Sequence, residues 1–141
     1  MYNDAELRAE LGREGVRFES ACDTETVAQA LARWGAEAIG RFRGMFALAA
    51  VDGRARRLVL ARDPLGIKPL YYWVGPCGGG AGGGLQVVFA SEPAAVVAHP
   101  EVGARPDLVT VSAYLTTIRT VLGERTLFEG VRTLLPGEVI E

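Results

Sequence analysis

The sequence predicts an α+β domain in which short helices and strands alternate along the chain. Apolar residues recur at helical spacing in the first part of the chain, at Leu7 and Leu11 and again over 27–34. A continuous apolar run over 45–51 is followed by Asp-Gly and by a second apolar run over 57–61. Because an Asp-Gly pair between two apolar runs is typical of a β-hairpin, these two strands should pair antiparallel.

The first helix has a recognisable start and end. Asn3 is expected to cap it, and Glu6 stands at the position that completes a capping box. Gly12 and Gly15 should end this helix, since glycine is poorly suited to helix interiors and common at C-caps. A short strand is predicted to follow over 17–19.

The second helix carries an apolar stripe that we expect to face the core rather than a ligand. Val27, Leu31 and Trp34 recur at i, i+4 and i+7, and Gly35 should end the helix. A further helical turn over 39–42 is predicted before the hairpin begins.

The second strand of the hairpin leads into a turn and another strand. Arg62 and Asp63 follow the apolar run, and the residues at 64–66 supply the fixed φ of proline and the permissive glycine that a chain reversal needs. A strand is predicted over 70–73. From spacing alone, Arg62 and Asp63 are interpreted as a structural ion pair in a buried hairpin rather than as active-site residues.

The remaining chain continues the alternation. The Gly-rich stretch over 75–84 is interpreted as a flexible loop, because no Gly-Lys-Ser or Gly-Lys-Thr closes it as a phosphate-binding loop requires. A strand over 85–90 and a helix over 91–99 should follow. Asp107 is expected to cap a last helix, and the tail over 126–140 is rich in turns.

Composition indicates one soluble domain. The chain has 141 residues, 49% of them hydrophobic, a net charge of -2 and no basic cluster, which gives no case for nucleic-acid binding. No apolar run reaches the length of a membrane span.

Cys22 and Cys77 are interpreted as reduced thiols of a cytoplasmic protein, and His99, the single histidine, has no partners for a zinc site. The positive mean hydropathy of +0.17 fits strands that are buried on both faces, or apolar surface that is covered by sequence outside these residues.

Five blocks of sequence resemble one protein family, in the family's order. They are SACDTE at 20–25, FRGMFALA at 42–49, ARDPLGIKPLYY at 61–72, FASE at 89–92 and TLFEGVRTLLPG at 126–137. Together they resemble the N-terminal glutaminase domain of glutamine-hydrolysing asparagine synthetase, a class II glutamine amidotransferase. The block at 61–72 alone also fits the amidophosphoribosyltransferases, which share that fold. The blocks at 89–92 and 126–137 favour the asparagine synthetase branch.

The resemblance implies a partial four-layer αββα sandwich of the N-terminal-nucleophile hydrolase type over residues 1–141. In the family, the nucleophile is an N-terminal cysteine whose own α-amine is the general base, and an Asn-Gly-Glu segment before Ile-Tyr-Asn forms the oxyanion hole. This chain begins Met1-Tyr2-Asn3, so we expect both parts to be missing. Neither Cys22 nor Cys77 can supply the terminal amine. We therefore assign no catalytic residue and expect this chain alone to be inactive.

The resemblance also implies a second domain that these residues do not contain. In the family, the segment matching 126–141 leads to a C-terminal synthetase domain, where ATP activates aspartate as an adenylate and ammonia displaces AMP. ATP and Mg are therefore expected in the absent synthetase domain, and no cofactor or metal site is expected here. A missing N-terminal segment or a partner chain would complete the protein, and exposed sheet edges should otherwise favour association.

Asp23 is the one residue to which the resemblance assigns a ligand role. In the family, the aspartate of this segment binds the α-amine of glutamine, the expected small-molecule substrate. Without the resemblance, Asp23 or Thr24 would be interpreted as the cap of the helix that begins there. Both roles are compatible, because a carboxylate at a helix N-terminus stays ionised. Arg62 and Lys68 match a different motif and are not assigned to the substrate carboxylate.

Three functions remain open from the sequence. The chain is part of a glutamine-dependent asparagine synthetase, or a non-catalytic binding or scaffold module that keeps the fold, or an amidophosphoribosyltransferase-type glutaminase. The tail over 126–137 fits the third function poorly. An in-frame Cys-Gly start and an Asn-Gly-Glu segment upstream would decide between the first two.

Overall fold

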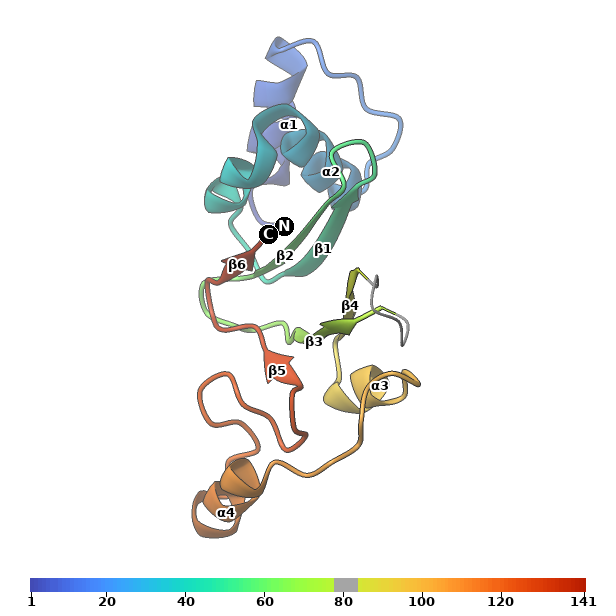
Figure 1. The fold of residues 1–141 in the computed structure, drawn as a ribbon. Coiled ribbons are helices and arrows are strands. Elements are labelled where there is room, and N and C mark those ends of the chain that lie inside the picture. Colours follow the sequence, from blue (N-terminus) through green and yellow to red (C-terminus); the bar gives the residue numbers. More distant parts are fainter. Residues whose placement is uncertain (78–83) are drawn as a thin grey trace.

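The computed structural model describes residues 1–77 and 84–141 and combines helices with antiparallel strands (Figure 1). The helical elements are α1 (Asp4–Arg13), α2 (Asp23–Trp34), the 3-10 helix η1 (Gly35–Arg41), α3 (Pro93–Val97) and α4 (Leu108–Thr117). The strands are β1 (Ala47–Asp52), β2 (Arg57–Arg62), β3 (Tyr71–Pro76), β4 (Leu85–Ala90), β5 (Arg132–Thr133) and β6 (Val139–Ile140). This arrangement confirms the predicted α+β class.

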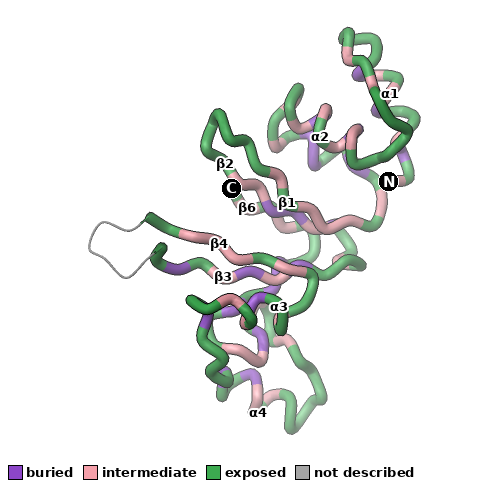
Figure 2. Tube along the Cα trace, turned by 90° about the vertical axis from the view of Figure 1, so that its right-hand side faces the viewer, coloured by how far each residue is buried: buried purple, intermediate pink, exposed green. Residues whose placement is uncertain are grey.

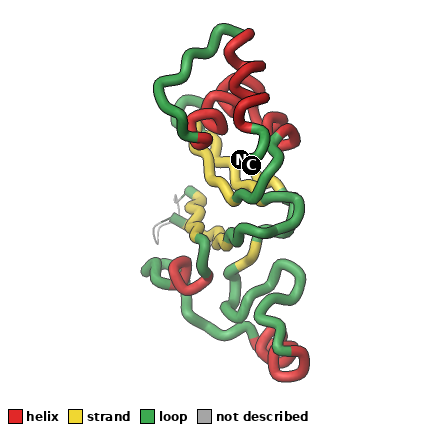
Figure 3. Tube along the Cα trace, turned by 180° about the vertical axis from the view of Figure 1, so that it is seen from behind, coloured by secondary structure: helices red, strands yellow, loops and turns green. Residues whose placement is uncertain are grey.

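The strands form two three-stranded sheets, with the orders β1-β2-β6 and β4-β3-β5. Every pair is antiparallel, and the predicted hairpin is present because β1 pairs with β2 from Ala47 opposite Arg62. The last strand, β6, returns to β2 and places Ile140 opposite Leu60. Figure 3 shows the strands of both sheets in the middle of the molecule, with helices above and below them.

The helices α1, α2 and η1 cover one face of the β1-β2-β6 sheet (Figure 1). Their buried side chains pack with Ala61 of β2; they are Leu7, Leu11, Ala30, Ala38, Ile39 and, just after η1, Phe42. The stripe predicted in α2 lies at the rim of this core, since Val27, Leu31 and Trp34 are partly buried whereas Ala30 is fully buried.

The opposite face of the β1-β2-β6 sheet packs against the second sheet. The buried residues of this cluster are Leu60, Leu70, Tyr72 and Leu134. Because side chains alternate along a strand, Tyr71 and Trp73 point the other way from Tyr72. There they pack with Val96 of α3 and with Val131.

Asn3 stands at the N-cap position of α1 without capping it, so the predicted capping box is wrong. The Asn3 side chain donates to the carbonyl of Arg41 and accepts from the N–H of Arg43, both at 2.9 Å. The carboxylate of Glu6 accepts from the Arg43 guanidinium at 2.6 Å. These contacts fasten the start of α1 to the end of η1, which uses the polar groups that local capping would need.

The strand predicted over 17–19 does not form. The N–H groups of Glu19 and Ser20 donate to the Glu25 carboxylate, each at 2.7 Å. The guanidinium of Arg8 lies 4.4 Å from the centroid of the Phe18 ring. Side chains of α1 and α2 thus hold this segment in place of a neighbouring strand.

The turn between β1 and β2 is longer than a two-residue Asp-Gly hairpin. The Asp52 side chain accepts from the N–H groups of Arg54 and Ala55, at 2.9 and 3.0 Å. The left-handed backbone conformation falls on Arg56, with φ of 54°, and not on Gly53. The aspartate therefore organises this turn through its side chain.

The Gly-rich loop begins later than predicted. Gly75 and Pro76 belong to β3 and pair with Gln86 and Leu85 of β4. A Cβ at Gly75 would lie 1.9 Å from the Trp73 ring, so a side chain there would require this ring to move. The rest of the predicted loop, 78–83, lies outside the described residues.

The helix α4 begins as predicted. The Asp107 carboxylate accepts from the N–H of Thr110 at 2.8 Å and from the Arg125 guanidinium at 2.6 Å. Most residues of α4 are exposed (Figure 2). They include Leu108 and Leu115, whose large apolar side chains are exposed. Within the described ranges, no helix combines the length and the apolar character that crossing a bilayer requires.

Candidate functional site

Asp23, the residue predicted to bind an α-amine, is the first residue of α2. Its Oδ2 accepts a hydrogen bond from the α-ammonium of Met1 at 2.5 Å. This hydrogen bond, and then the positive charge itself, lower the pKa of the Asp23 carboxyl. The Asp23 side chain is 48% exposed, so an ionised carboxylate is accessible to a small molecule. Cys22 occupies the N-cap position, so neither Asp23 nor Thr24 is the capping residue.

Two charged side chains that the sequence interpretation missed hold the segment before Asp23. The Glu25 carboxylate accepts from the Ser20 hydroxyl at 2.6 Å, in addition to its two backbone bonds. The Arg8 guanidinium donates to the carbonyls of Ser20 and Cys22, at 2.9 and 2.7 Å. The entry into α2 is thereby fixed from both sides. The spacing of Ser20 and Glu25 in the sequence could have indicated their contact, but no local sequence feature indicates the contacts of Arg8.

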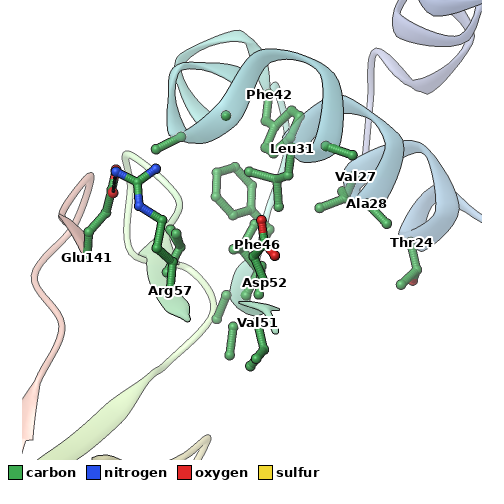
Figure 4. Close-up of a pocket in the computed structure, with 18 of the residues that line it drawn as sticks. Thr24, Val27, Ala28, Leu31, Phe42, Phe46, Val51, Asp52, Arg57 and Glu141 are labelled. Carbon is green, nitrogen blue, oxygen red and sulfur yellow. Dashed lines mark ion pairs between the residues drawn. The ribbon is translucent and has the colours of Figure 1, made fainter. Parts of the chain in front are cut away.

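Asp23 lines a cleft of about 1010 Å³ between α2 and the β1–β2 hairpin. Val27 and Leu31 of α2 form one wall, and Phe46 lies below them (Figure 4). On the side away from α2, Arg57 contacts Glu141 across 3.4 Å between their charged groups (Figure 4). The cleft therefore combines the apolar side chains of α2 with charged side chains, which include Asp23, Asp52 and Arg57.

Arg62 and Asp63, interpreted from sequence as an ion pair, bond to backbone groups instead. Arg62 donates to the carbonyls of Lys68, Gly66 and Leu134, at 2.8, 2.7 and 2.6 Å. No salt bridge within the described residues involves either side chain. Arg62 thus joins the turn after β2 to the tail that leads to β6.

The Asp63 carboxylate is 1% exposed and accepts four backbone hydrogen bonds. The donors are the N–H groups of Leu65, Ile67, Lys68 and Phe46, at distances of 3.0 to 3.3 Å. Burial alone would raise the pKa of Asp63, but these bonds outweigh it and the pKa is lowered. Because Phe46 lines the cleft, Asp63 also fixes one part of the cleft floor.

The family described as "Glutamine amidotransferase domain" matches residues 1–141 of the chain. The chain belongs to this family. The match covers every element described above, including Asp23, the cleft and the turn held by Arg62 and Asp63.

Several curated proteins are similar to this glutamine amidotransferase domain. Asparagine synthetase (glutamine-hydrolyzing) 3 of Bacillus subtilis (strain 168) is 30% identical over 140 residues, which cover 99% of this chain and 22% of the relative. Asparagine synthetase (glutamine-hydrolyzing) 1 of the same organism is 43% identical over 72 residues, covering 51% and 11%. Asparagine synthetase (glutamine-hydrolyzing) 2 of Oryza sativa subsp. japonica is 38% identical over 71 residues, covering 50% and 12%. The chain thus spans about a fifth of the length of the first of these relatives.

The cysteines of the glutamine amidotransferase domain are both exposed; Cys22 directly precedes α2 and Cys77 directly follows β3. The Thr24 side chain and backbone lower the pKa of the Cys22 thiol, which lies beside Asp23 at the start of α2. Cys77 lies at the end of β3, where its N–H donates to the carbonyl of Gly84 at 2.7 Å. Within residues 1–77 and 84–141, no group of three or more His, Cys, Asp or Glu side chains is arranged to hold a metal ion.

Proposed function

We propose that this chain is the glutaminase part of a glutamine-dependent asparagine synthetase. In the complete protein it would release ammonia from glutamine for the ATP-dependent amidation of aspartate. The observation that carries this proposal is the match of the whole chain to the glutamine amidotransferase domain family, together with relatives named as glutamine-hydrolysing asparagine synthetases.

We propose the fold to be a partial four-layer αββα sandwich of the N-terminal-nucleophile hydrolase type. Three hydrophobic clusters support this proposal. The first lies between the helices α1, α2 and η1 and the β1-β2-β6 sheet, the second between the two sheets, and the third between the β4-β3-β5 sheet and α3. The order of these clusters matches the order of layers in such a sandwich.

Asp23 is proposed to bind the α-ammonium of glutamine. The contact with the Met1 ammonium supports this role, because the same carboxylate oxygen already accepts from a group of the same chemistry. An aspartate carboxyl ordinarily ionises well below neutral pH, so Asp23 is negatively charged at neutral pH whether or not the Met1 nitrogen is an ammonium. The positioning by Arg8 and Glu25 supports the role further, since a binding carboxylate needs a fixed backbone.

The nucleophile and the oxyanion hole are proposed to come from polypeptide outside these 141 residues. Glutaminase chemistry of this type needs a cysteine that carries a free α-amine, and Cys22 and Cys77 are both internal. The domain over 1–141 would continue, through its segment 126–141, into a synthetase domain that binds ATP and Mg. By itself this chain should not hydrolyse glutamine above background.

The test compares this chain with the protein extended through the in-frame codons upstream of Met1. Ammonia release from glutamine is expected only from the extended protein, and a thiol alkylator should abolish it. Asp23→Asn in the extended protein should raise the KM for glutamine about tenfold, the lower end for a charge-assisted contact because the site is half exposed. Asp107→Asn, the same change at the N-cap of α4 and outside the cleft, is the matched control and should leave the KM unchanged.

Two results would contradict the proposal. One is ammonia release by the 141-residue chain above that of a heat-inactivated sample. The other is a glutamine KM that Asp23→Asn leaves unaltered while thermal stability falls, which would make Asp23 a purely structural residue.

A further inference from the structure

The helix α4 ends on an isoleucine in an unusual backbone conformation. Ile118 occupies the C-cap position with φ of 56° and ψ of 15°, and its N–H donates to the carbonyl of Tyr114 at 2.7 Å. A β-branched residue is rare in this left-handed region, where glycine is preferred because it has no Cβ. The Ile118 side chain is also 84% exposed. The left-handed conformation therefore costs free energy that burial of this side chain does not offset in the isolated chain.

A small apolar pocket lies a short way along the chain from Ile118. The pocket has a volume of about 220 Å³, and its apolar lining residues are Tyr71 of β3, Pro93 of α3, Val121, Leu127 and Phe128. Ile118 does not line this pocket, so its side chain does not fill the pocket of its own chain. Thr120 does line it, and two residues of chain hold the Cα atoms of Ile118 and Thr120 within about 7 Å of each other. An exposed apolar side chain and an apolar pocket thus lie close together on one surface.

The residues next to Ile118 and next to the pocket carry opposite charges. Arg119 directly follows Ile118, and Glu92 directly precedes Pro93 of the pocket; both side chains are exposed. Within residues 1–77 and 84–141, neither Arg119 nor Glu92 takes part in a salt bridge. The surface therefore presents a positive charge beside the exposed side chain and a negative charge beside the pocket.

We propose that this surface binds a second copy of the chain about a two-fold axis. Ile118 of each copy enters the apolar pocket of the other copy, and Arg119 of each copy faces Glu92 of the other. A two-fold contact uses the same patch on both copies, so the patch must be complementary to itself. This patch meets that condition, because it carries both the apolar side chain and the pocket, and both charges of the ion pair.

The position of α4 leaves room for such a contact. The helix lies at one end of the molecule (Figure 1), and no charged residue lies between Leu108 and Ile118. Two copies of α4 can therefore approach without repulsion between like charges along the helix. The contact lies outside the cleft that holds Asp23, so this inference goes beyond the proposed glutaminase activity and either can fail without the other.

The first test replaces Ile118 in the 141-residue chain and measures association by sedimentation equilibrium. The unsubstituted chain should form a dimer in the micromolar range. Ile118→Gly should raise the dissociation constant about a hundredfold, because each dimer loses two buried side chains and each contributes a factor of about ten. The same variant should raise the melting temperature of the monomer, since glycine adopts the left-handed conformation without strain.

Two results of this first test would overturn the proposal. One is a higher melting temperature of Ile118→Gly with an unchanged dissociation constant, and the other is an unsubstituted chain that stays monomeric. Leu65→Ala is the matched control, because Leu65 is as exposed as Ile118 but lies in the turn after β2. It should leave the dissociation constant unchanged.

A pair of charge variants tests the two-fold arrangement itself. Arg119→Glu and Glu92→Arg should each raise the dissociation constant at least threefold, and the double variant should restore it, because the charges then face each other with exchanged signs. In an equimolar mixture of isotope-labelled and unlabelled chains, isotope-filtered NOEs should connect the Ile118 methyl groups of one copy with the ring of Tyr71 or Phe128 of the other. A double variant as weak as the single ones, or a dimer without these NOEs, would overturn the proposal.

Discussion

Replacing Asp63 by asparagine removes one of the two oxygens that hold the turn after β2. One carboxylate oxygen accepts from Leu65 and Ile67, and the other accepts from Phe46 and Lys68. An asparagine amide has one oxygen and one NH2 group. In either orientation, two of the four backbone N–H groups then face a donor and lose their acceptor.

The expected loss of folding stability in the Asp63→Asn variant follows from the number of lost hydrogen bonds. Leaving a buried N–H without an acceptor costs about 1–3 kcal/mol, so two such groups cost about 2–6 kcal/mol. That is a large part of the roughly 5–15 kcal/mol by which a domain is stable. Urea unfolding at neutral pH should show a lower midpoint with an unchanged slope. Asp52→Asn is the matched control and should shift the midpoint less, because its two N–H partners lie in an exposed turn.

The pH dependence gives a second check on Asp63. The pKa of the Asp63 carboxyl is lowered in the folded protein. The ionised carboxylate therefore contributes its full share of folding stability above the unfolded pKa of about 3.9, and this share is lost as pH falls through the lower pKa of the folded state. The stability difference between the unsubstituted protein and the Asp63→Asn variant should be constant near neutral pH and shrink below about pH 4. An equal midpoint at neutral pH would refute the reasoning. A difference that persists undiminished in strong acid would show that the charge is not its cause.

Three further predictions concern α4, the entry to α2 and association. Asp107→Ala should lower the free energy of unfolding by about 1–2 kcal/mol. Asp107→Asn should lower it less, because asparagine is an equally good N-cap. Equal melting temperatures of the two variants would contradict this prediction. In the extended protein, Glu25→Gln should raise the KM for glutamine with little change in kcat, because the segment before Asp23 loses contacts that hold it. Steady-state kinetics in which only kcat falls would contradict this prediction. The 141-residue chain should sediment as concentration-dependent oligomers, since β1 is an open edge and Leu115 is 77% exposed; a monomer over the micromolar range would disprove this.

Local signals in the sequence were sufficient for the elements that local interactions determine. The apolar spacing in α2 and its terminal Gly35 predicted that helix, and the structure gives Gly35 a φ of 64° at the C-cap. The Asp107 cap is likewise a contact between residues three apart. The β1–β2 hairpin was predicted from two apolar runs, although its turn is organised by the Asp52 side chain.

The errors share one physical cause, which is bonding between polar side chains and distant backbone groups. Asn3 bonds to residues about forty positions away, and Glu25 takes the N–H groups that a strand over 17–19 would have used. Arg62 and Asp63 are adjacent in sequence but bond to separate sets of backbone atoms. The ligand role of Asp23 stays a prediction from the resemblance to a family, because nothing in its local spacing distinguishes an ammonium-binding carboxylate from a helix cap.

The backbone bonding of Arg62 and Asp63 divides the turn after β2 into two parts that respond differently to acid. Asp63 holds its part only while it is ionised, so protonation releases Leu65, Ile67 and the start of β1 together. Arg62 bonds to backbone carbonyls, which do not titrate, so this part of the turn does not depend on the ionisation of Asp63. Acid below about pH 4 should therefore free the cleft floor first while the tail stays attached through Leu134, which makes acid unfolding of this domain a sequence of two events.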